Sequence, residues 1–292
     1  MSRTQIASTQ RVSRENLEFM LFDWLRLDHL LERKPYADHE PDEIRAMLDV
    51  SEQIATTMFL PHNKRNDAEE PTFDGRQVRV HDEVRPALSA FAETGLVGAT
   101  VDTDQGGLSM PFTAAQACLA HFFAANVSTT TYATLASGVA NLILAHGSST
   151  QIAGFVPSLM DGRSLGTMCL SEPHAGSSLS DITTRAVPQP DGSYRITGQK
   201  MWIGAAGHEL SDNIIHLVLA RIAGAPSGIG GISLFIVPKY LDDGGDGPGE
   251  RNDVAVSEPQ DGIPRHRERG TQLRRRQPHA ARGNRGRRTD RR

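Results

Sequence analysis

The sequence predicts an α+β fold in which a helical N-terminal block is followed by a block of short strands and then by a disordered basic tail. Before about residue 160 the apolar residues recur with the 3.6-residue period of an amphipathic helix. After Gly162 the apolar segments are short, rich in strand-forming residues and separated by Gly, Pro and Asp. After about Glu250 neither pattern continues. Helices followed by strands are typical of an α+β protein or of two joined domains.

Capping residues and apolar spacing define the expected helices. Ser13 caps a first helix that reaches Leu31, and Pro41 opens a second that Pro61 ends, with the polar stretch 62–72 as a loop. The later helices are expected from Val84 to Gly95 and over Phe112–Asn126, Thr129–His146 and Thr150–Met160. The expected strands are Ser164–Ser171, Thr183–Pro188, Tyr194–Thr197, His216–Arg221 and Ile232–Val237.

The composition fits a globular protein with a packed core. Hydrophobic residues make up 38% and charged residues 23% of the 292 residues. No apolar run approaches the roughly 18 residues that span a bilayer, and the N-terminus lacks the apolar stretch of a secretory signal, so no membrane association is expected. Cys118 and Cys169 are the two cysteines. Their wide separation argues against a disulfide scaffold and for a reducing compartment such as the cytoplasm.

The net charge of −4 conceals a basic tail. Residues 257–292 contain 12 Arg, no Lys and 4 acidic residues, a balance of +8, which leaves −12 for the residues before them. From Pro264 onward the apolar residues are Leu273, Ala280 and Ala281. Such a segment cannot bury enough surface to offset its ordering entropy, so we expect disorder. Arginines can also neutralise nucleic-acid phosphates, but no aromatic residues for base stacking lie between them, so nucleic acid is not the favoured partner.

The segment Cys169–Asp181 (CLSEPHAGSSLSD) holds the densest group of chemically useful side chains. It reads as the end of a strand, a turn with proline, and a loop of small residues that lets a ligand approach the backbone closely. Ser171 and Ser177 offer hydroxyl groups, and Glu172 offers a carboxylate. The spacing alone favours a polar turn between two strands over a ligand site.

A second segment, Gly198–His208 (GQKMWIGAAGH), places a tryptophan before a run of small residues. Lys200–Ile203 can form a strand, after which Trp202 and the exposed backbone would wall one side of an aromatic cofactor. The alternative is a core tryptophan beside a loop, which is the more common arrangement.

Other candidate groups have simpler interpretations. Glu172 and Asp181 would make a carboxylate pair for acid–base chemistry, but Glu172 is better explained as holding the turn. His174 and His208 lack a second ligand at metal-site spacing and are expected to be solvated loop histidines, so no metal site is predicted. The Asp-Gly run at 242–247 lacks the closing Glu of a calcium loop and is expected to be a flexible loop.

Together the two segments resemble the flavin signatures of the acyl-CoA dehydrogenase family, in the expected order and spacing. Further resemblance lies in Asn213–Arg221, Gly231–Pro238 and Gly249–Val254, and it is greatest to the 3-methylthiopropionyl-CoA and long-chain-like branch. The family fold is a helical N-terminal domain, a middle β-barrel and a C-terminal four-helix domain. The resemblance divides this chain into a helical extension (1–34), a helical domain (35–162), an incomplete β-barrel domain (163–256) and the tail (257–292).

The resemblance implies an FAD-dependent oxidoreductase that dehydrogenates an acyl-CoA thioester. A carboxylate removes the α-proton, the β-hydride passes to the flavin, and an electron-transfer flavoprotein accepts the electrons. Intact relatives are homo-oligomers. Ser171 would lie near the pyrimidine end of the isoalloxazine, and Ser177 would also lie near the acyl-CoA. The implied FAD contacts are Met168, Cys169, Leu170, Ser171, Gly176, Ser177, Trp202, Ile203 and Gly204.

This sequence departs from the family pattern at three places. Ser178 stands where the family has Asp, and Asp181 where it has a small residue. Gly204 stands where a Ser or Thr donates a hydrogen bond near flavin N5, a loss of about 0.5–1.5 kcal/mol. After Val254 the Arg-rich segment, which a frameshift would explain, replaces the helices that carry the base. We therefore expect an inactive chain with no catalytic residue of its own. The alternative is a noncatalytic remnant, or a binding protein whose tail contacts nucleic acid.

Overall fold

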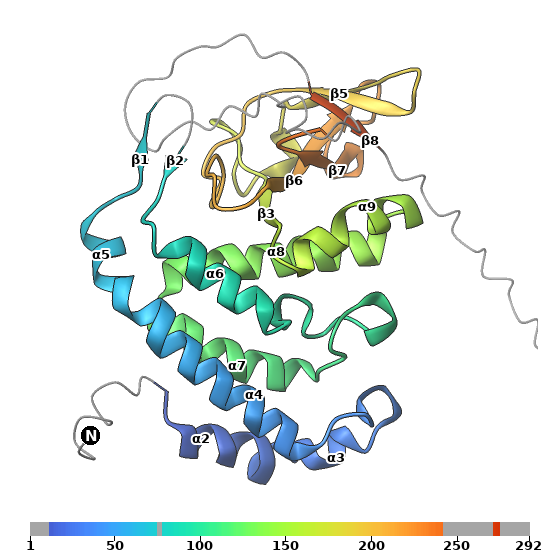
Figure 1. Ribbon diagram of the computed structural model, residues 1–292. Coiled ribbons are helices and arrows are strands. Elements are labelled where there is room, and N and C mark those ends of the chain that lie inside the picture. The colour runs from blue at the N-terminus through green and yellow to red at the C-terminus, as the bar shows by residue number, and fades with distance from the viewer. Residues whose placement is uncertain (1–11, 75–77, 242–270, 275–292) are drawn as a thin grey trace, which may run out of the picture.

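The computed structural model describes residues 12–74 and 78–241, together with the backbone of residues 271–274. Helices make up the first part and a sheet the second, and Figure 1 shows the helices in layers beneath the sheet. This arrangement confirms the predicted α+β class. The expectations for residues 242–247 and for the Arg-rich tail lie outside the described residues, except that Thr271–Arg274 forms strand β8 where we expected a disordered chain.

The N-terminal extension packs on the helical domain through buried leucines and through polar contacts that include Arg14. Its elements are α2 (Arg14–Glu18), a π-helical turn η1 (Phe19–Trp24) and α3 (Leu27–Leu31). The Ser13 hydroxyl accepts a hydrogen bond from the Asn16 N–H at 3.3 Å, which confirms the predicted cap. Arg14 donates to the Arg45 carbonyl at 3.0 Å and lies 2.7 Å from an Asp49 carboxylate oxygen, so α2 is tied to the next long helix.

The helical domain follows the predicted pattern closely. Pro41 occupies the first turn of α4, and the Asn126 side chain at the end of α7 accepts from the Thr129 N–H at 3.1 Å and so caps α8. Two small elements, β1 (Thr72–Phe73) and β2 (Val78–Arg79), form an antiparallel hairpin. The helices are α4 (Pro41–Ile54), η3 (Ala55–Phe59), η4 (Leu60–His62), α5 (Asn63–Ala68), α6 (Val84–Glu93), α7 (Phe112–Ala125), α8 (Val127–His146) and α9 (Ser149–Met160).

The loop predicted for residues 62–72 is wrong at its start, because Asn63–Ala68 forms α5. The 3-10 turn that contains Pro61 leads directly into this helix. Arg65 then binds Glu69 at 3.2 Å and Glu83 at 2.7 Å on the surface. None of the α5 side chains is buried. A helix without an apolar face carries no hydrophobic period for the sequence to reveal.

The second part of the chain is a mixed sheet whose longest strand is central. In this sheet β3 is parallel to the first half of β6, while β7 is antiparallel to most of β6. The predicted strands are confirmed to within a few residues, but Lys200–Ile203 is not a strand. The strands are β3 (Ser164–Cys169), β4 (Arg185–Pro188), β5 (Ser193–Thr197), β6 (Asn213–Ile222), β7 (Ile232–Pro238) and β8 (Thr271–Arg274).

Strand β6 contributes to two hydrophobic cores. Ile215 and Leu217 pack with the core of the helical domain, whereas Val218 and Ala220 belong to a smaller core inside the sheet domain. Helix α8 lies directly against β3, and Gly166 leaves no room for a side chain at this contact. A Cβ atom at Gly166 would lie 2.7 Å from a methyl carbon of Val139. The helical domain therefore supports the strand that leads into the first signature segment.

Candidate functional site

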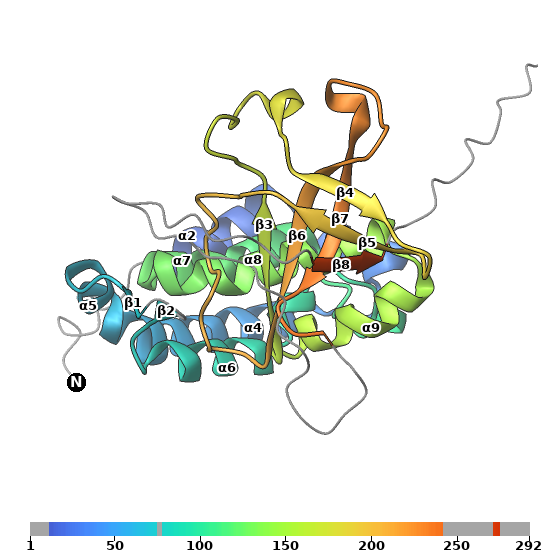
Figure 2. The ribbon, with the colours of Figure 1, turned by 90° about the horizontal axis from the view of Figure 1, so that it is seen from above.

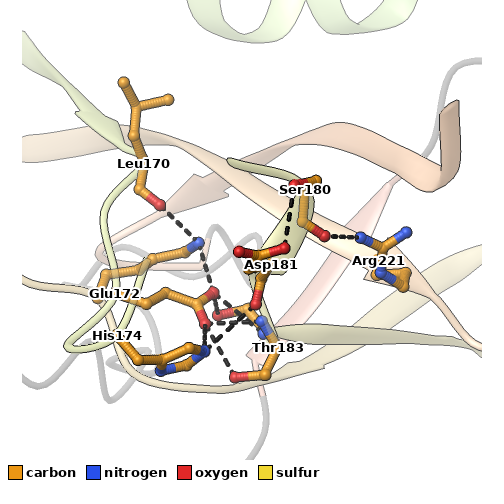
Figure 3. A network of polar contacts seen from close by, with 9 residues as sticks. Leu170, Glu172, His174, Ser180, Asp181, Thr183 and Arg221 are labelled. Atoms are coloured by element: carbon orange, nitrogen blue, oxygen red, sulfur yellow. Dashed lines mark hydrogen bonds and ion pairs between the residues drawn. The ribbon is translucent and has the colours of Figure 1, made fainter. Parts of the chain in front are cut away.

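Glu172 organises the turn that follows β3. Its side chain is almost completely buried, and both of its carboxylate oxygens accept hydrogen bonds. One oxygen accepts from the Thr183 N–H at 2.7 Å and from the Thr183 hydroxyl at 2.9 Å, and the other accepts from the Thr184 N–H at 3.0 Å and from the Thr184 hydroxyl. Figure 3 shows this cluster, with Thr183 beside the carboxylate. As predicted, Glu172 holds the turn.

These contacts set the charge state of Glu172. Burial by itself would raise the pKa of the carboxyl group, but the hydrogen bonds from Thr184, Thr183 and Lys200 outweigh it and bring the pKa to about 2. Glu172 is therefore a carboxylate at neutral pH. A general base works best with a pKa near the operating pH, so this buried carboxylate with occupied oxygens is poorly suited to take a proton from a substrate.

Lys200 joins the two signature segments. Its ammonium group donates to a Glu172 oxygen at 2.9 Å and to the Leu170 carbonyl at 3.0 Å. The next residue, Met201, donates its N–H to the Ser171 carbonyl at 3.0 Å. Segments that lie far apart in the sequence thus run side by side, as the second flavin signature would require.

Residues 201–207, which we call the strap, have a strained backbone. Trp202 and Ala205 adopt positive φ angles of 60° and 61°, which residues with a side chain rarely adopt, and Gly207 has a φ of 78°. The positive φ at Trp202 ends any continuation of a strand, which explains why the strand prediction for Lys200–Ile203 is wrong. The Trp202 side chain is 68% exposed, so it is not the core tryptophan that we considered as an alternative.

The far end of the strap is anchored on the helical domain. The Gly207 carbonyl accepts from the N–H of Val78 in β2 at 2.9 Å, and the Lys239 ammonium donates to the His208 carbonyl at 2.8 Å. His208 is 1% exposed, and its ring stacks edge-on against that of Tyr132. Burial, with the nearby Lys239 charge, lowers the pKa of His208 to about 3. The prediction of a solvated His208 is therefore wrong.

The remaining sequence-predicted residues divide into exposed and buried groups. The side chain of Met168 packs against the helical core, and those of Cys169 and Ile203 pack in the sheet domain, so a ligand would meet Cys169 through its backbone. Burial raises the pKa of the Cys169 thiol to about 11. Leu170 and Ser171 are partly buried. The exposed members of the predicted set are Gly176, Ser177, Trp202 and Gly204.

Gly176 and Gly204 border open space. A Cβ atom added at either position would have no heavy atom within 4 Å. The open space at Gly204 lies two residues from the exposed indole of Trp202. A flat ring system could therefore contact this part of the strap without displacing protein atoms.

Other titratable groups near the turn have modest roles. His174 is half-exposed, with its ring nitrogen 3.7 Å from a Glu172 oxygen, which agrees with the predicted loop histidine. Arg221 donates to the Ser180 carbonyl (Figure 3). It also donates to the carbonyls of Pro226 and Gly228 and so connects two loops at the end of β6. Within the described ranges, no cluster of three His, Cys, Asp or Glu side chains could hold a metal ion.

The roles of Lys200, Thr183 and Thr184 could not be predicted from the residues around them. Each looks ordinary in the sequence, because a lysine and two threonines carry no periodic signal. The available clue was Glu172 itself. A carboxylate between a strand and a small-residue loop requires donors or a cation if it is buried, and Lys200 is the cation in the neighbouring signature.

The chain folds as a helical domain followed by a sheet domain, and each of these domains matches a family model. Residues 41–163 match the acyl-CoA dehydrogenase N-terminal domain, and residues 167–264 match the acyl-CoA dehydrogenase middle domain. The chain therefore belongs to the acyl-CoA dehydrogenase family, which confirms the resemblance inferred from its two signatures.

Individual relatives agree with this assignment. The chain is 34% identical over 232 residues to the 3-methylmercaptopropionyl-CoA dehydrogenase of Ruegeria pomeroyi, a match that covers 80% of this chain and 39% of that protein. It is 36% identical over 245 residues to the broad-specificity linear acyl-CoA dehydrogenase FadE5 of Mycobacterium tuberculosis, covering 82% and 39%. The chain thus spans about two fifths of the length of these relatives.

A solved structure shows the same fold. The acyl-CoA dehydrogenase of Bacillus anthracis, solved in complex with FAD, superposes with a TM-score of 0.57 at 24% identity, over 70% of this chain and 32% of that one. None of the helices in the described part of this chain combines the length and the apolar character needed to cross a membrane.

Proposed function

We propose that this chain supplies the helical and middle domains of an FAD-dependent acyl-CoA dehydrogenase, with FAD held along residues 168–177 and 202–204. The observation that carries the proposal is the strap. An exposed tryptophan with a strained backbone faces solvent directly after the contacts that join the two signatures. Strained conformations persist where the surrounding structure imposes them, and they cluster at ligand sites.

The residues present fit the cofactor. Trp202 offers an aromatic face to the isoalloxazine, and Gly176 and Gly204 leave room for close approach to the backbone. Ser171 uses its carbonyl to bind Met201, so its hydroxyl is the group that we assign to the pyrimidine end of the ring. Ser177 is exposed and is assigned to both FAD and the acyl-CoA.

Bound FAD would accept a hydride from the substrate β-carbon. The chain's own residues would orient the ring, cover one of its faces with Trp202 and leave the acyl-CoA on the side of Ser177. The buried Glu172 carboxylate holds the turn after β3. No base is assigned among the described residues. We therefore expect little turnover from the 292 residues tested alone. As the finer assignments we propose an electron-transfer flavoprotein as the electron acceptor, assembly into a homo-oligomer, and the cytoplasm as the compartment.

The proposal can be tested by titrating FAD into the purified chain and into the variant Trp202→Ala. Loss of one stacked aromatic typically costs 1–3 kcal/mol, so the Kd should rise by about 5- to 150-fold. Trp24→Ala is the matched control, because Trp24 has the same 68% exposure but lies in the N-terminal extension. Equal affinities for the chain and for Trp202→Ala would remove Trp202 from the site, and no binding by the unchanged chain would contradict the proposal.

A further inference from the structure

We infer that Lys200 is a positioning residue, which holds the strap, and with it Trp202, against the segment that follows β3. The inference rests on the proposed FAD site, because its functional consequence is the placement of Trp202 relative to Ser171. The side-chain hydrogen bonds of Lys200 go to neither Trp202 nor Gly204. Its two partners are the Leu170 carbonyl and the Glu172 carboxylate.

Glu172, Thr183 and Thr184 form a group, which we call the frame, that is held together without the strap. Thr183 and Thr184 supply four hydrogen bonds to the carboxylate, and these join the turn after β3 to the chain entering β4. Those four bonds remain when Lys200 is removed. The frame can therefore survive without the ammonium group, whereas the strap loses its side-chain link to the frame.

The strap has two kinds of other restraint at this end. The Met201 N–H donates to the Ser171 carbonyl, and the partly buried Ile203 side chain packs against the sheet-domain core, whereas the exposed Trp202 side chain is not packed in a core. A left-handed backbone at Trp202 is intrinsically unfavourable, so it must be imposed from outside. Lys200 is two residues away, is 10% exposed and has a fixed position between two acceptors.

The consequence for ligand binding is preorganisation. If the indole is already held where the cofactor needs it, binding does not have to order the strap. Without Lys200 the strap would sample other conformations, and FAD would bind more weakly even though the residues assigned to its contacts are unchanged.

The first test needs no cofactor. In the Trp24→Phe background Trp202 is the single tryptophan, and its fluorescence anisotropy decay reports its local motion. Adding Lys200→Met should lower the residual anisotropy of Trp202, and Lys200→Arg should largely restore it, because a guanidinium can also bridge a carbonyl and a carboxylate. Unchanged anisotropy in Lys200→Met would overturn the inference.

The second test measures FAD affinity. Lys200→Met should raise the Kd for FAD at least about tenfold, with Lys200→Arg closer to the unchanged chain. Arg14→Met is the control, because Arg14 also binds a backbone carbonyl and carboxylates, those of Glu18 and Asp49, but lies in the N-terminal extension. The melting temperatures of Lys200→Met and Arg14→Met compare the stability that each variant loses.

The outcomes distinguish the two proposals. An Arg14→Met variant that loses as much stability and as much FAD affinity as Lys200→Met would overturn the inference, because the loss would then follow global destabilisation. If the unchanged chain binds no FAD, the proposed function fails, yet a fall in Trp202 anisotropy in Lys200→Met would still support the positioning role.

Discussion

Tyr132 and His208 meet edge to face, with ring centroids 5.3 Å apart, although Tyr132 lies in α8 and His208 directly follows the strap. This contact fixes the rear of the strap to the helical domain. The imidazole in this contact is neutral at pH 7, because burial lowers the pKa of His208 to about 3. His216, whose ring nitrogen lies 2.7 Å from the Thr167 hydroxyl inside the sheet domain, is held at a pKa of about 3 by the same cause.

Two buried neutral histidines predict a loss of stability in mild acid. In the unfolded chain a histidine takes up a proton near pH 6.5, whereas the folded chain resists protonation down to about pH 3, so the unfolded state binds more protons between these values. Stability is therefore full above pH 6.5 and falls as the pH drops below it. Between pH 8 and pH 5 each histidine should cost about 2 kcal/mol.

Urea unfolding at several pH values between 8 and 5 measures this slope. The variant His216→Gln keeps a hydrogen-bonding group for Thr167 but cannot be protonated, so its stability should fall less steeply with acid. His62 and His121, whose pKa values burial also lowers, leave a residual slope. A variant with the full slope of the unchanged chain would show that His216 is not responsible.

Gly166 should be intolerant of any side chain. The Cβ of Gly166→Ala would lie 2.7 Å from a Val139 methyl carbon and 3.0 Å from the Leu135 carbonyl oxygen, so α8 would be pushed away from β3. Overpacking of this kind costs about 1–3 kcal/mol. Gly138→Ala, in the same helix but facing open space, should instead stabilise by about 0.5–1 kcal/mol. Thermal unfolding of both variants checks the pair, and equal shifts would contradict the packing.

The variant Gly204→Ser should fold normally and bind FAD more tightly than the unchanged chain. The position has room for a side chain, and the family resemblance implies a Ser or Thr here whose hydroxyl donates to the flavin. One such bond contributes about 0.5–1.5 kcal/mol, so the Kd for Gly204→Ser should fall by about 2- to 12-fold. Gly204→Ala fills the same space without the hydroxyl and should show no such gain. Tighter binding by both variants would assign the effect to packing.

Removing the charge of Glu172 should be far more costly than removing that of Glu69. Both carboxylates pair with a basic side chain, Glu172 with Lys200 at 2.9 Å and Glu69 with Arg65 at 3.2 Å, but Glu172 and Lys200 are 1% and 10% exposed whereas Glu69 and Arg65 are 60% and 48% exposed. Breaking a buried pair costs about 3–5 kcal/mol, and an exposed pair less than about 1 kcal/mol. Urea unfolding of Glu172→Gln and Glu69→Gln at pH 7 measures the difference. Similar losses would show that the turn does not depend on Glu172.

Local signals predicted much of the fold. Ser13, Pro41 and Gly147 mark helix ends that the structure contains, because capping and proline geometry depend on a few neighbouring residues. Family resemblance assigned the two signature segments to one FAD site, and in the structure Lys200 joins them. The six-residue helix α5 escaped detection because none of its residues is buried.

The strap could not be predicted in the same way. Lys200–Ile203 contains strand-forming residues, yet Trp202 has a left-handed backbone that distant contacts impose. His208 follows a glycine and reads as a loop histidine, but it is buried because Tyr132, from a helix much earlier in the chain, packs against it. The backbone of Trp202 and the burial of His208 both depend on contacts between segments far apart in the sequence. The residues next to them in the sequence give no signal of such contacts.

The contribution of strand β6 to both cores also determines how the protein unfolds. Figure 2 shows this strand running from the helices into the sheet domain, and its Leu217 and Val218, adjacent in sequence, belong to different cores. Neither core can lose this strand without exposing the other. The helical and sheet domains should therefore melt together in one transition, and a helical fragment cut before β3 would present bare apolar residues of α8 to water and aggregate.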